Sequence, residues 1–112
     1  MQCTPCDISI ETEADALARQ TLEAFGRIDI LFNNAGIIRR ATVLETTEEE
    51  WDRVMAVNVK SIYLLSREVI PIMARGGGGV IINTASGWGL VGGRNAVSYC
   101  ASKGAVVNMT RA

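Results

Sequence analysis

The sequence predicts a parallel α/β sheet, because candidate strands and helices alternate along the chain. Two strands are expected, one in the apolar run at residues 28–32, which polar and small residues follow, and one in "VIINTAS" at residues 80–86; both are typical of strands buried on both faces. Three longer segments, residues 11–25, 51–73 and 96–112, carry apolar side chains at helical spacing. This alternation favours helices packed on the faces of parallel strands.

The first helix is expected from Glu11 to Phe25. Ser9 or Thr12 is its candidate N-cap, and Gly26 is expected to end it. The strand in "IDILFNNAG" follows directly and should end in a polar turn.

The second helix is expected from Trp51 to Met73, with Thr46 or Thr47 as the candidate N-cap. Three glutamates at residues 48–50 lie in the first turn, where the positive end of the helix dipole favours acidic side chains. We interpret this acidic cluster as a dipole effect and not as a metal site.

Two glycine-rich stretches lack the context of a phosphate-binding loop. Pro71 and the four glycines at 76–79 are expected to end the second helix, and a strand follows, so we interpret the glycines as a flexible turn. Residues 87–92, "GWGLVG", match G-x-G-x-x-G, but "GRNAVS" follows where the phosphate-binding helix should begin. The chain also has no acidic residue after Glu68, whereas the dinucleotide fingerprint expects one about 20 positions on. We interpret this second stretch as a flexible loop beside an active site.

The composition favours one soluble globular unit. The chain has 112 residues and a formal net charge of −1, so no nucleic-acid partner is expected. No apolar run approaches the roughly 18 residues of a membrane helix, and the start of the chain lacks a signal-peptide pattern, so no membrane partner is expected. Three cysteines favour a reducing cytoplasm over a disulfide framework. The pair Cys3-x-x-Cys6 has neither a second pair nor a histidine, so no metal site is expected.

The chain contains no histidine, so acid–base chemistry must fall to tyrosine, lysine, cysteine or carboxylate side chains. Tyr99 and Lys103, in "SYCASKGA", are four positions apart, which on a helix places two side chains about 5–6 Å apart on one face. A free phenol has a pKa of about 10 and exchanges protons poorly at neutral pH. An ammonium at that separation stabilises a phenolate by on the order of 3 kcal/mol at an effective dielectric constant of about 20. Such a pair is common by chance, but its geometry suits a general acid–base.

Four features occur in order along the chain: "NNAG" at 33–36, Asn58 within a helix, Ser86 at the end of a strand, and Tyr99-x-x-x-Lys103. Ser86 precedes the tyrosine by 13 residues, and Asn58 follows the first asparagine of "NNAG" by 25. Together these features resemble the classical branch of the short-chain dehydrogenase/reductase family. The resemblance implies a Rossmann-like, doubly wound parallel sheet. It also implies an oxidoreductase that interconverts a secondary alcohol and a ketone with NAD or NADP.

The resemblance assigns a role to each catalytic position. Tyr99 is implied to exchange a proton with the substrate oxygen, and Lys103 to stabilise the phenolate and hydrogen-bond the nicotinamide ribose. Ser86 is implied to hydrogen-bond the same substrate oxygen. Asn58 is implied to interrupt its helix so that its backbone carbonyl holds a water molecule, which links Lys103 to solvent.

The resemblance also assigns cofactor-binding positions. Asn33 and Asn34 are implied to tie the strand end to its neighbours, while Ala35 and Gly36 let the cofactor ribose approach the backbone. Asp7 is implied to accept a hydrogen bond from the adenine amine, and Ile8 to supply a backbone contact. NAD and NADP cannot be distinguished, because the deciding residue in this fold follows the second strand, which the 112 residues do not include.

The resemblance covers the whole chain but only the middle of the family's fold. Residues 1–112 are expected to be a partial NAD(P)-binding Rossmann domain, from the end of strand three in "PCDI" to the catalytic helix, without the first two strands and the C-terminal lobe. In the strand order 3-2-1-4-5-6, strand three adjoins neither strand four nor strand five, so Cys3–Ile8 should be the least settled segment. Alone, the fragment is expected to be inactive, with Leu31, Val80 and Ile82 exposed.

Two alternatives stay open. The extended branch of epimerases and dehydratases shares Tyr-x-x-x-Lys but usually lacks "NNAG". A catalytically silent cofactor-binding or scaffold protein of the same fold is the alternative outside the enzymes. In the leading interpretation the partner is a small-molecule alcohol or ketone, and the family implies that the parent enzyme is a homodimer or homotetramer.

Overall fold

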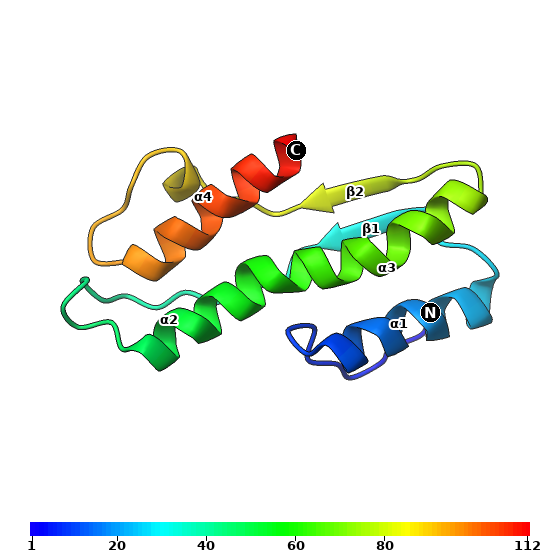
Figure 1. Ribbon diagram of the computed structural model, residues 1–112, viewed down its shortest axis with the longest axis horizontal. Helices are drawn as coiled ribbons and strands as arrows, with labels where there is room; N and C mark the ends of the chain where they lie inside the picture. The colour runs from blue at the N-terminus through cyan, green and yellow to red at the C-terminus, as the bar shows by residue number, and fades with distance from the viewer. The chain divides into compact units, whose positions relative to one another are not determined.

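The computed structural model describes residues 1–112, and its helices and strands alternate as predicted (Figure 1). The elements are, in order, α1 (Glu11–Phe25), β1 (Ile30–Asn33), α2 (Glu48–Met55), the π-helical turn η1 (Ala56–Lys60), α3 (Ser61–Arg75), β2 (Val80–Asn83), the 3₁₀ turn η2 (Gly87–Gly89) and α4 (Val97–Arg111). They form two compact units. The first comprises residues 1–33 and 61–82, and the second comprises residues 34–60 and 83–112. None of the helices is both long enough and apolar enough to span a membrane.

β1 and β2 are neighbours in a two-stranded parallel sheet (Figure 1). The N–H of Val80 donates to the carbonyl of Asp29 at 2.9 Å, beside the start of both strands. Parallel neighbours need a long crossover connection, and the chain between β1 and β2 includes α3, which packs against β1. The predicted parallel α/β class is therefore confirmed.

α1 and α3 form the core of the first unit by packing their apolar stripes together. The buried residues form two clusters: Ala14, Leu64 and Leu65, and Ala18, Val69 and Met73. Ala14 and Ala18 are small and one helical turn apart, so α1 can approach α3 closely at both positions. Leu31 and Ile81 pack against these clusters from the sheet. The two helices therefore cover one face of the sheet.

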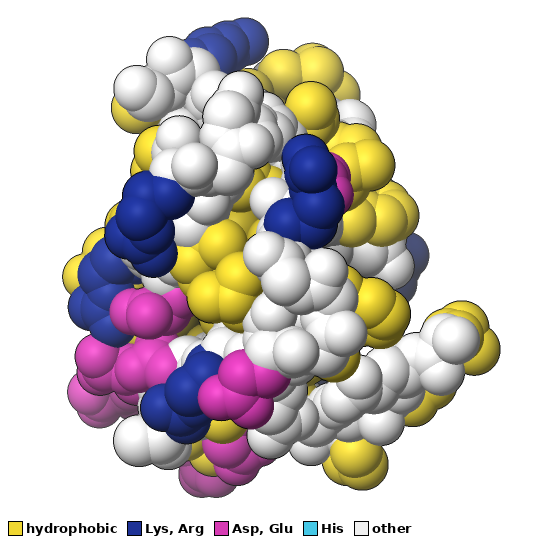
Figure 2. All heavy atoms as spheres, turned by 90° about the vertical axis from the view of Figure 1, so that its right-hand side faces the viewer, with side chains coloured by type: hydrophobic (Ala, Val, Ile, Leu, Met, Phe, Trp, Pro, Cys, Tyr) yellow, Lys and Arg dark blue, Asp and Glu magenta, His cyan; other side chains and the backbone are white.

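The other face of the sheet is exposed. Side chains alternate along a strand, so Leu31 turns towards the helices, whereas Ile30 and Phe32 are 64% and 60% exposed. On β2, Val80 is 56% exposed and Ile82 is 46% exposed. The prediction of exposure is confirmed for Val80 and Ile82 and is wrong for Leu31, because Leu31 belongs to the face that the helices cover. Hydrophobic side chains are visible at the surface beside charged ones in Figure 2.

α1 begins without a side-chain cap, so both predicted caps, Ser9 and Thr12, are wrong. The N-cap is Ile10, and Thr12 lies inside the helix. Ser9 is engaged in the preceding turn, where its N–H and its hydroxyl donate to the carboxylate of Asp7 at 3.0 and 2.6 Å. The predicted end at Gly26 is confirmed, since Gly26 adopts the left-handed conformation with φ of 76°.

Residues 1–7 form no strand. In the strand order that the family implies, two strands separate this segment from β1, so it has no hydrogen-bonding neighbour among the 112 residues. The segment is attached to α1 instead. The N–H of Asp7 donates to the Glu13 carboxylate at 2.6 Å, and Ile8 packs against the Ala14 cluster. Burial of the Cys6 thiol, together with the charges of Glu13 and Asp7, raises the pKa of Cys6, which keeps the thiol protonated at neutral pH.

α2 opens with a complete capping box, which confirms Thr47 as the N-cap. The hydroxyl of Thr47 accepts from the N–H of Glu50 at 3.1 Å, and the Glu50 carboxylate accepts from the N–H of Thr47 at 3.3 Å. The alternative cap, Thr46, donates its hydroxyl to the carbonyl of Thr42 at 2.7 Å. The acidic residues 48–50 occupy the first turn as predicted.

The helix predicted over Trp51–Met73 is longer and less regular than expected. It begins with α2, passes through the π turn η1 and ends at Arg75. Pro71 does not end the helix, contrary to the prediction, because it lies within α3. Proline leaves one intrahelical hydrogen bond unmade. Val69 and Met73, on either side of it, are buried in the core and hold the last turns of α3 in place.

The glycines at 76–79 end the helix and form the predicted turn. Gly77 and Gly78 have φ of 98° and 118°, which glycine adopts without strain, and the N–H of Gly78 donates to the carbonyl of Met73 at 2.8 Å. At Gly79 the chain passes close to its neighbours. A Cβ there would lie 2.5 Å from Met73 Sδ and 2.9 Å from the carbonyl oxygen of Asp29.

The capping box of α2 gives a prediction for stability. We expect Thr47→Ala to lower the free energy of unfolding by about 1 kcal/mol, because the N–H of Glu50 loses its acceptor. Thr47→Ser keeps the hydroxyl, so its free energy of unfolding is expected to fall by less than half of that amount. Urea denaturation followed by circular dichroism measures both variants, and equal losses in the two would show that the cap hydrogen bond is not the cause.

Candidate active site

The second unit places all four predicted catalytic residues on neighbouring elements. Tyr99 and Lys103 lie on α4, Asn58 lies in η1, and Ser86 is the N-cap of η2. α4 packs against α2, η1 and η2. The helix that carries the tyrosine and the lysine is therefore the element on which the rest of this unit packs.

Lys103 is buried, with 4% of its surface exposed. Its ammonium donates to the carbonyl oxygen of Thr84 at 2.7 Å, and Nζ lies 5.8 Å from the centroid of the Tyr99 ring. The spacing of four residues thus places the cation beside the phenol, as expected for a helix. An ammonium has three N–H donors, and one of them is used by Thr84, so two are available to a ligand.

Tyr99 is half-buried and packs edge-on against Trp88, with ring centroids 6.1 Å apart and an interplanar angle of 82°. The backbone of Gly93 lies against the indole, since a Cβ on Gly93 would be 2.4 Å from it. The guanidinium carbon of Arg40 lies over the same indole, 5.0 Å from the ring centroid. Trp88 therefore links the phenol to two different loops.

The side chain of Asn58 joins three segments of the chain. It is 1% exposed, and its Oδ1 accepts from the N–H of Ile37 at 2.8 Å. Its Nδ2 donates to the carbonyl of Ile37 at 2.8 Å and to the hydroxyl of Ser102 at 2.9 Å. Ser102 in turn donates to the carbonyl of Tyr99 at 2.8 Å. The expected interruption of the helix at Asn58 takes the form of the π turn η1.

Ser86 lies at the turn that follows β2. Its hydroxyl oxygen accepts from the N–H of Trp88 at 3.2 Å and so caps η2. This contact leaves the hydroxyl proton available as a donor. The structure shows no hydrogen bond between Ser86 and Tyr99.

A cleft of about 240 Å³ opens beside α4. It is lined by Asn34, Gly36, Ile37, Ile38, Thr84, Ala85, Tyr99 and Lys103. The hydroxyl of Thr84 donates to Oδ1 of Asn34 at 3.0 Å and connects two of its walls. A Cβ on Gly36 would lie 3.5 Å from both Lys103 Nζ and Asn58 Oδ1, so the backbone at Gly36 lies against both groups. Lys103 is the one charged side chain of the lining.

The residues predicted for the cofactor are divided between the units. Gly36 lines the cleft of the second unit, and Ala35 beside it is exposed. Asn33, the last residue of β1, is buried in the first unit. Asp7 and Ile8 also belong to the first unit, where Asp7 accepts hydrogen bonds from Ser9 and Ile8 packs on the core. The second unit thus contains Ala35, Gly36 and all four residues predicted to be catalytic, whereas Asn33, Asp7 and Ile8 belong to the first.

One glycine of "GWGLVG", Gly89, has a packing role. A Cβ on Gly89 would lie 2.5 Å from the carbonyl oxygen of Lys103 and 3.0 Å from the N–H nitrogen of Gly104. The backbone of η2 therefore touches the backbone of α4 at the lysine. The stretch interpreted as a flexible loop begins with this 3₁₀ turn, packed directly on the helix that carries Tyr99 and Lys103.

Sequence reasoning missed several residues of the site. Ser102 lies inside the Tyr-x-x-x-Lys motif, and its position three residues after Tyr99 was the one signal that it faces the same side of the helix. Ile37 and Thr84 contribute through backbone groups, which residue identity does not reveal. Trp88 lies within "GWGLVG", where no sequence pattern indicates its contact with Tyr99.

Comparison with known proteins finds a family model, curated relatives and a solved structure that are all described as dehydrogenases, reductases or oxidoreductases. The family model described as short chain dehydrogenase matches residues 1–112. An uncharacterized oxidoreductase of Thermotoga maritima is 44% identical over 102 residues, which cover 91% of this chain and 41% of the relative. A 2-dehydro-3-deoxy-D-gluconate 5-dehydrogenase of Dickeya dadantii is 46% identical over 97 residues, which cover 86% of this chain and 38% of the relative. A crystal structure of levodione reductase matches with a TM-score of 0.92 and 39% identity, over 96% of this chain and 42% of that one.

The chain thus spans about two fifths of the length of these relatives. The match to the crystal structure confirms the predicted Rossmann-like parallel α/β fold. The family model covers every residue, including "NNAG", Asn58, Ser86, Tyr99 and Lys103. The chain belongs to the short-chain dehydrogenase family.

Proposed function

We propose that the protein containing this chain is an NAD- or NADP-dependent oxidoreductase that interconverts a secondary alcohol and a ketone by hydride transfer. The observation that carries the proposal is that Tyr99 and the buried ammonium of Lys103 line one cleft. The relatives named as a dehydrogenase and a reductase support it. Within such a protein, residues 1–112 form the central, catalytic portion of the NAD(P)-binding Rossmann domain.

The cleft fits a nicotinamide cofactor in two respects. Lys103 has two N–H donors available for ribose hydroxyls, and the missing side chain of Gly36 leaves space beside that ammonium. Ala35 offers backbone groups next to Gly36, and Asn33 holds the end of β1 from which this loop starts. Bound there, the cofactor would supply or accept the hydride.

We assign the adenine end of the cofactor to Asp7 and Ile8 on the strength of the family resemblance. An ionised aspartate is an acceptor for an exocyclic amine. In the structure the Asp7 carboxylate accepts two hydrogen bonds from Ser9, both to Oδ1.

Tyr99 is the proposed general acid in the direction of reduction. It donates its phenolic proton to the carbonyl oxygen while the carbonyl carbon becomes a carbinol carbon. Lys103, with Nζ 5.8 Å from the ring centroid, stabilises the phenolate that this step leaves. Ser86 donates its hydroxyl proton in a hydrogen bond to the same substrate oxygen. In the direction of oxidation the phenolate takes the proton from the alcohol.

Asn58 is proposed to serve the site in two ways. Its side chain fixes the loop at Ile37 and the α4 turn at Ser102. Its backbone carbonyl lies in a π turn, where backbone hydrogen bonds connect residues five apart and local geometry departs from that of an α-helix. We propose that this carbonyl binds the water through which Lys103 exchanges protons with solvent.

The function is tested on the intact protein with NADH, NADPH and a panel of ketones of increasing ring and chain size. Turnover of at least one ketone, with stoichiometric oxidation of the cofactor, is the expected result. Cofactor binding without turnover of any substrate would favour the catalytically silent alternative, and absence of binding to either cofactor would overturn the proposal.

Tyr99→Phe removes the transferable proton and keeps the ring that packs on Trp88. We expect turnover to fall at least 100-fold, in line with the usual contribution of a general acid–base, while the dissociation constant of the cofactor changes less than threefold. Steady-state kinetics and fluorescence titration of NADH measure the two quantities. Activity within threefold of the unaltered protein would exclude this role for Tyr99.

Lys103→Ala is expected to lower turnover and to weaken cofactor binding together, because one ammonium serves both the phenol and the ribose. Lys60→Ala is the matched control, since Lys60 is an exposed lysine at the end of η1. It should leave both quantities within twofold. If Lys103→Ala lowers turnover and leaves the cofactor dissociation constant unchanged, the proposed ribose contact is wrong.

Ser102 is a proposed positioning residue, because its hydroxyl connects Asn58 to the carbonyl of Tyr99. Ser102→Ala removes both contacts from a fully buried position, and we expect it to lower the free energy of unfolding by about 1–3 kcal/mol and turnover about tenfold. Ser98→Ala is the control, since the Ser98 hydroxyl is buried one turn earlier and has no hydrogen-bond partner. Equal effects of the two substitutions on stability and turnover would contradict the positioning role.

A further inference from the structure

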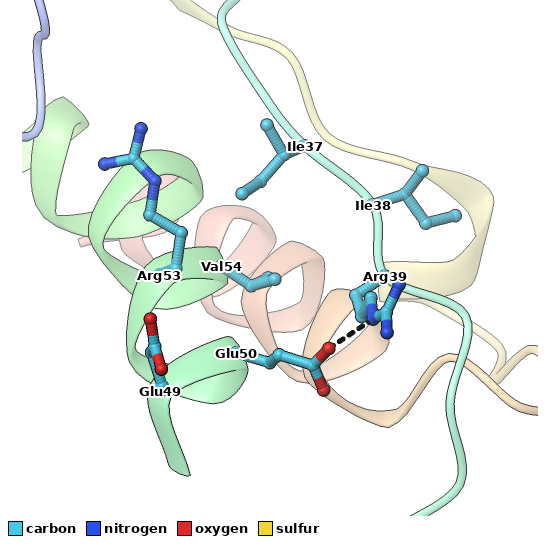
Figure 3. A pocket seen from close by; sticks show the side chains of 7 residues that line it. All are labelled: Ile37, Ile38, Arg39, Glu49, Glu50, Arg53 and Val54. Carbon is cyan, nitrogen blue, oxygen red and sulfur yellow. Dashed lines mark ion pairs between the residues drawn. The ribbon is translucent and has the colours of Figure 1, made fainter. Parts of the chain in front are cut away.

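The loop that follows "NNAG" carries two adjacent arginines in different electrostatic settings. Arg39 is paired with Glu50, with Nε 2.6 Å from Oε1, and Figure 3 shows this pair at a small pocket of about 220 Å³ that Ile37, Ile38 and Val54 also line. Arg40 has no carboxylate within 4.0 Å. The pair with Glu50 neutralises Arg39, so Arg40 is the cation of this loop that is available to a ligand.

Arg40 is held by an aromatic ring. Its guanidinium carbon lies 5.0 Å from the centroid of the Trp88 ring. The ring attracts the charge of the guanidinium but accepts none of its five N–H groups in a conventional hydrogen bond, so these donors stay available to bind a carboxylate or similar anion. The indole thus orients Arg40 without consuming its hydrogen-bonding capacity.

The same indole contacts the proposed acid–base. The Trp88 and Tyr99 rings meet edge-on with centroids 6.1 Å apart. Trp88 therefore contacts Arg40 and the ring of Tyr99 at the same time and places the two side chains near each other. Gly93, which lies against the indole, and Gly89, which lies against the backbone at Lys103, fix this arrangement relative to α4.

The lining of the cleft beside α4 contains no carboxylate. The chain contains no aspartate or glutamate after Glu68, so neither the segment from β2 to η2 nor α4 carries an acidic side chain. Lys103, the one charged residue of the lining, is buried and hydrogen-bonded to a carbonyl. Clefts lined by one sign of charge raise the local concentration of ligands of the opposite sign.

We propose that the substrate is an alcohol or ketone that also carries an anionic group, a carboxylate or a sulfonate, and that Arg40 binds this group beside Trp88. This inference rests on the proposed function and adds to it the chemical class of the substrate. Tyr99 acts on the oxygen of the carbinol or carbonyl group, and Arg40 determines which molecules are placed there. Arg40 is thus a specificity-determining residue.

The test compares keto carboxylates with their methyl esters on the intact protein, so that each pair differs in charge and shares the reacting ketone. We expect kcat/KM to be at least tenfold higher for the acid than for the ester at low ionic strength. Arg40→Gln should reduce that ratio at least tenfold, mainly through KM for the acid. Arg94→Gln, which removes another exposed arginine from the loop before α4, should leave the ratio unchanged.

A second readout does not depend on turnover. In a Trp51→Phe background, Trp88 is the one tryptophan of the 112 residues, and its fluorescence should respond to the keto acid at lower concentration than to the ester. Arg40→Gln should abolish that difference.

Three outcomes would overturn the inference. The first is an ester that is turned over as well as its acid. The second is an acid preference that Arg40→Gln leaves unchanged. The third is an Arg40→Gln variant whose KM rises for the cofactor and not for the keto acid, which would assign Arg40 to a cofactor phosphate. In each of these cases, turnover of ketones would still support the proposed oxidoreductase activity. Absence of turnover for every ketone would instead contradict the proposed activity and, with it, the inference about an anionic substrate.

Discussion

One carboxamide group, that of Asn58, determines how the second unit is assembled. It is buried, and it satisfies both backbone groups of Ile37 while it donates to Ser102. Hydrogen bonds in such an environment are strong when complete and costly when broken. Pairing with an N–H and a carbonyl of the same residue requires an acceptor and a donor on one short side chain. Asparagine carries both groups. Aspartate, which is similar in size, has no donor when ionised, and leucine has neither a donor nor an acceptor.

The irregular backbone around Asn58 is a consequence of this arrangement. A single α-helix from Thr47 onwards would satisfy local rules better than a helix interrupted by five π-helical residues. The interruption lies where the side chain of Asn58 hydrogen-bonds both the loop at Ile37 and α4 at Ser102. Natural proteins depart from local rules mainly at functional sites. The π turn at Ala56–Lys60 is such a departure, and it lies beside the helix that carries Tyr99 and Lys103.

The fold was predictable from sequence because its signals are local. Thr47 with Glu50, and Gly26 after an amphipathic helix, are short-range patterns with one physical interpretation each. The errors arose where a contact distant in sequence decided the outcome. Pro71 reads as a helix end until Val69 and Met73 are seen in the core, and Leu31 reads as exposed until α1 and α3 are seen to cover its face.

The candidate site was predictable only in part, for a related reason. Tyr99 and Lys103 are separated by one helical turn, so their proximity follows from the helix alone. The carbonyl of Thr84, which binds Lys103, and the backbone of Ile37, which binds Asn58, carry no signature in residue type. Arg40 and Trp88 meet across 48 positions, and no pattern in the sequence relates them.

The loop between β2 and α4 combines fixed and free positions, and this bears on which substitutions the loop tolerates. Gly89 and Gly93 have no room for a side chain, the first against the α4 backbone and the second against Trp88. Leu90 and Val91 between them are 69% and 70% exposed. Substitutions at these two positions can alter what the loop presents without moving η2 away from the helix. Variation of the loop is therefore expected to be tolerated at residues 90 and 91 and to be excluded at Gly89 and Gly93.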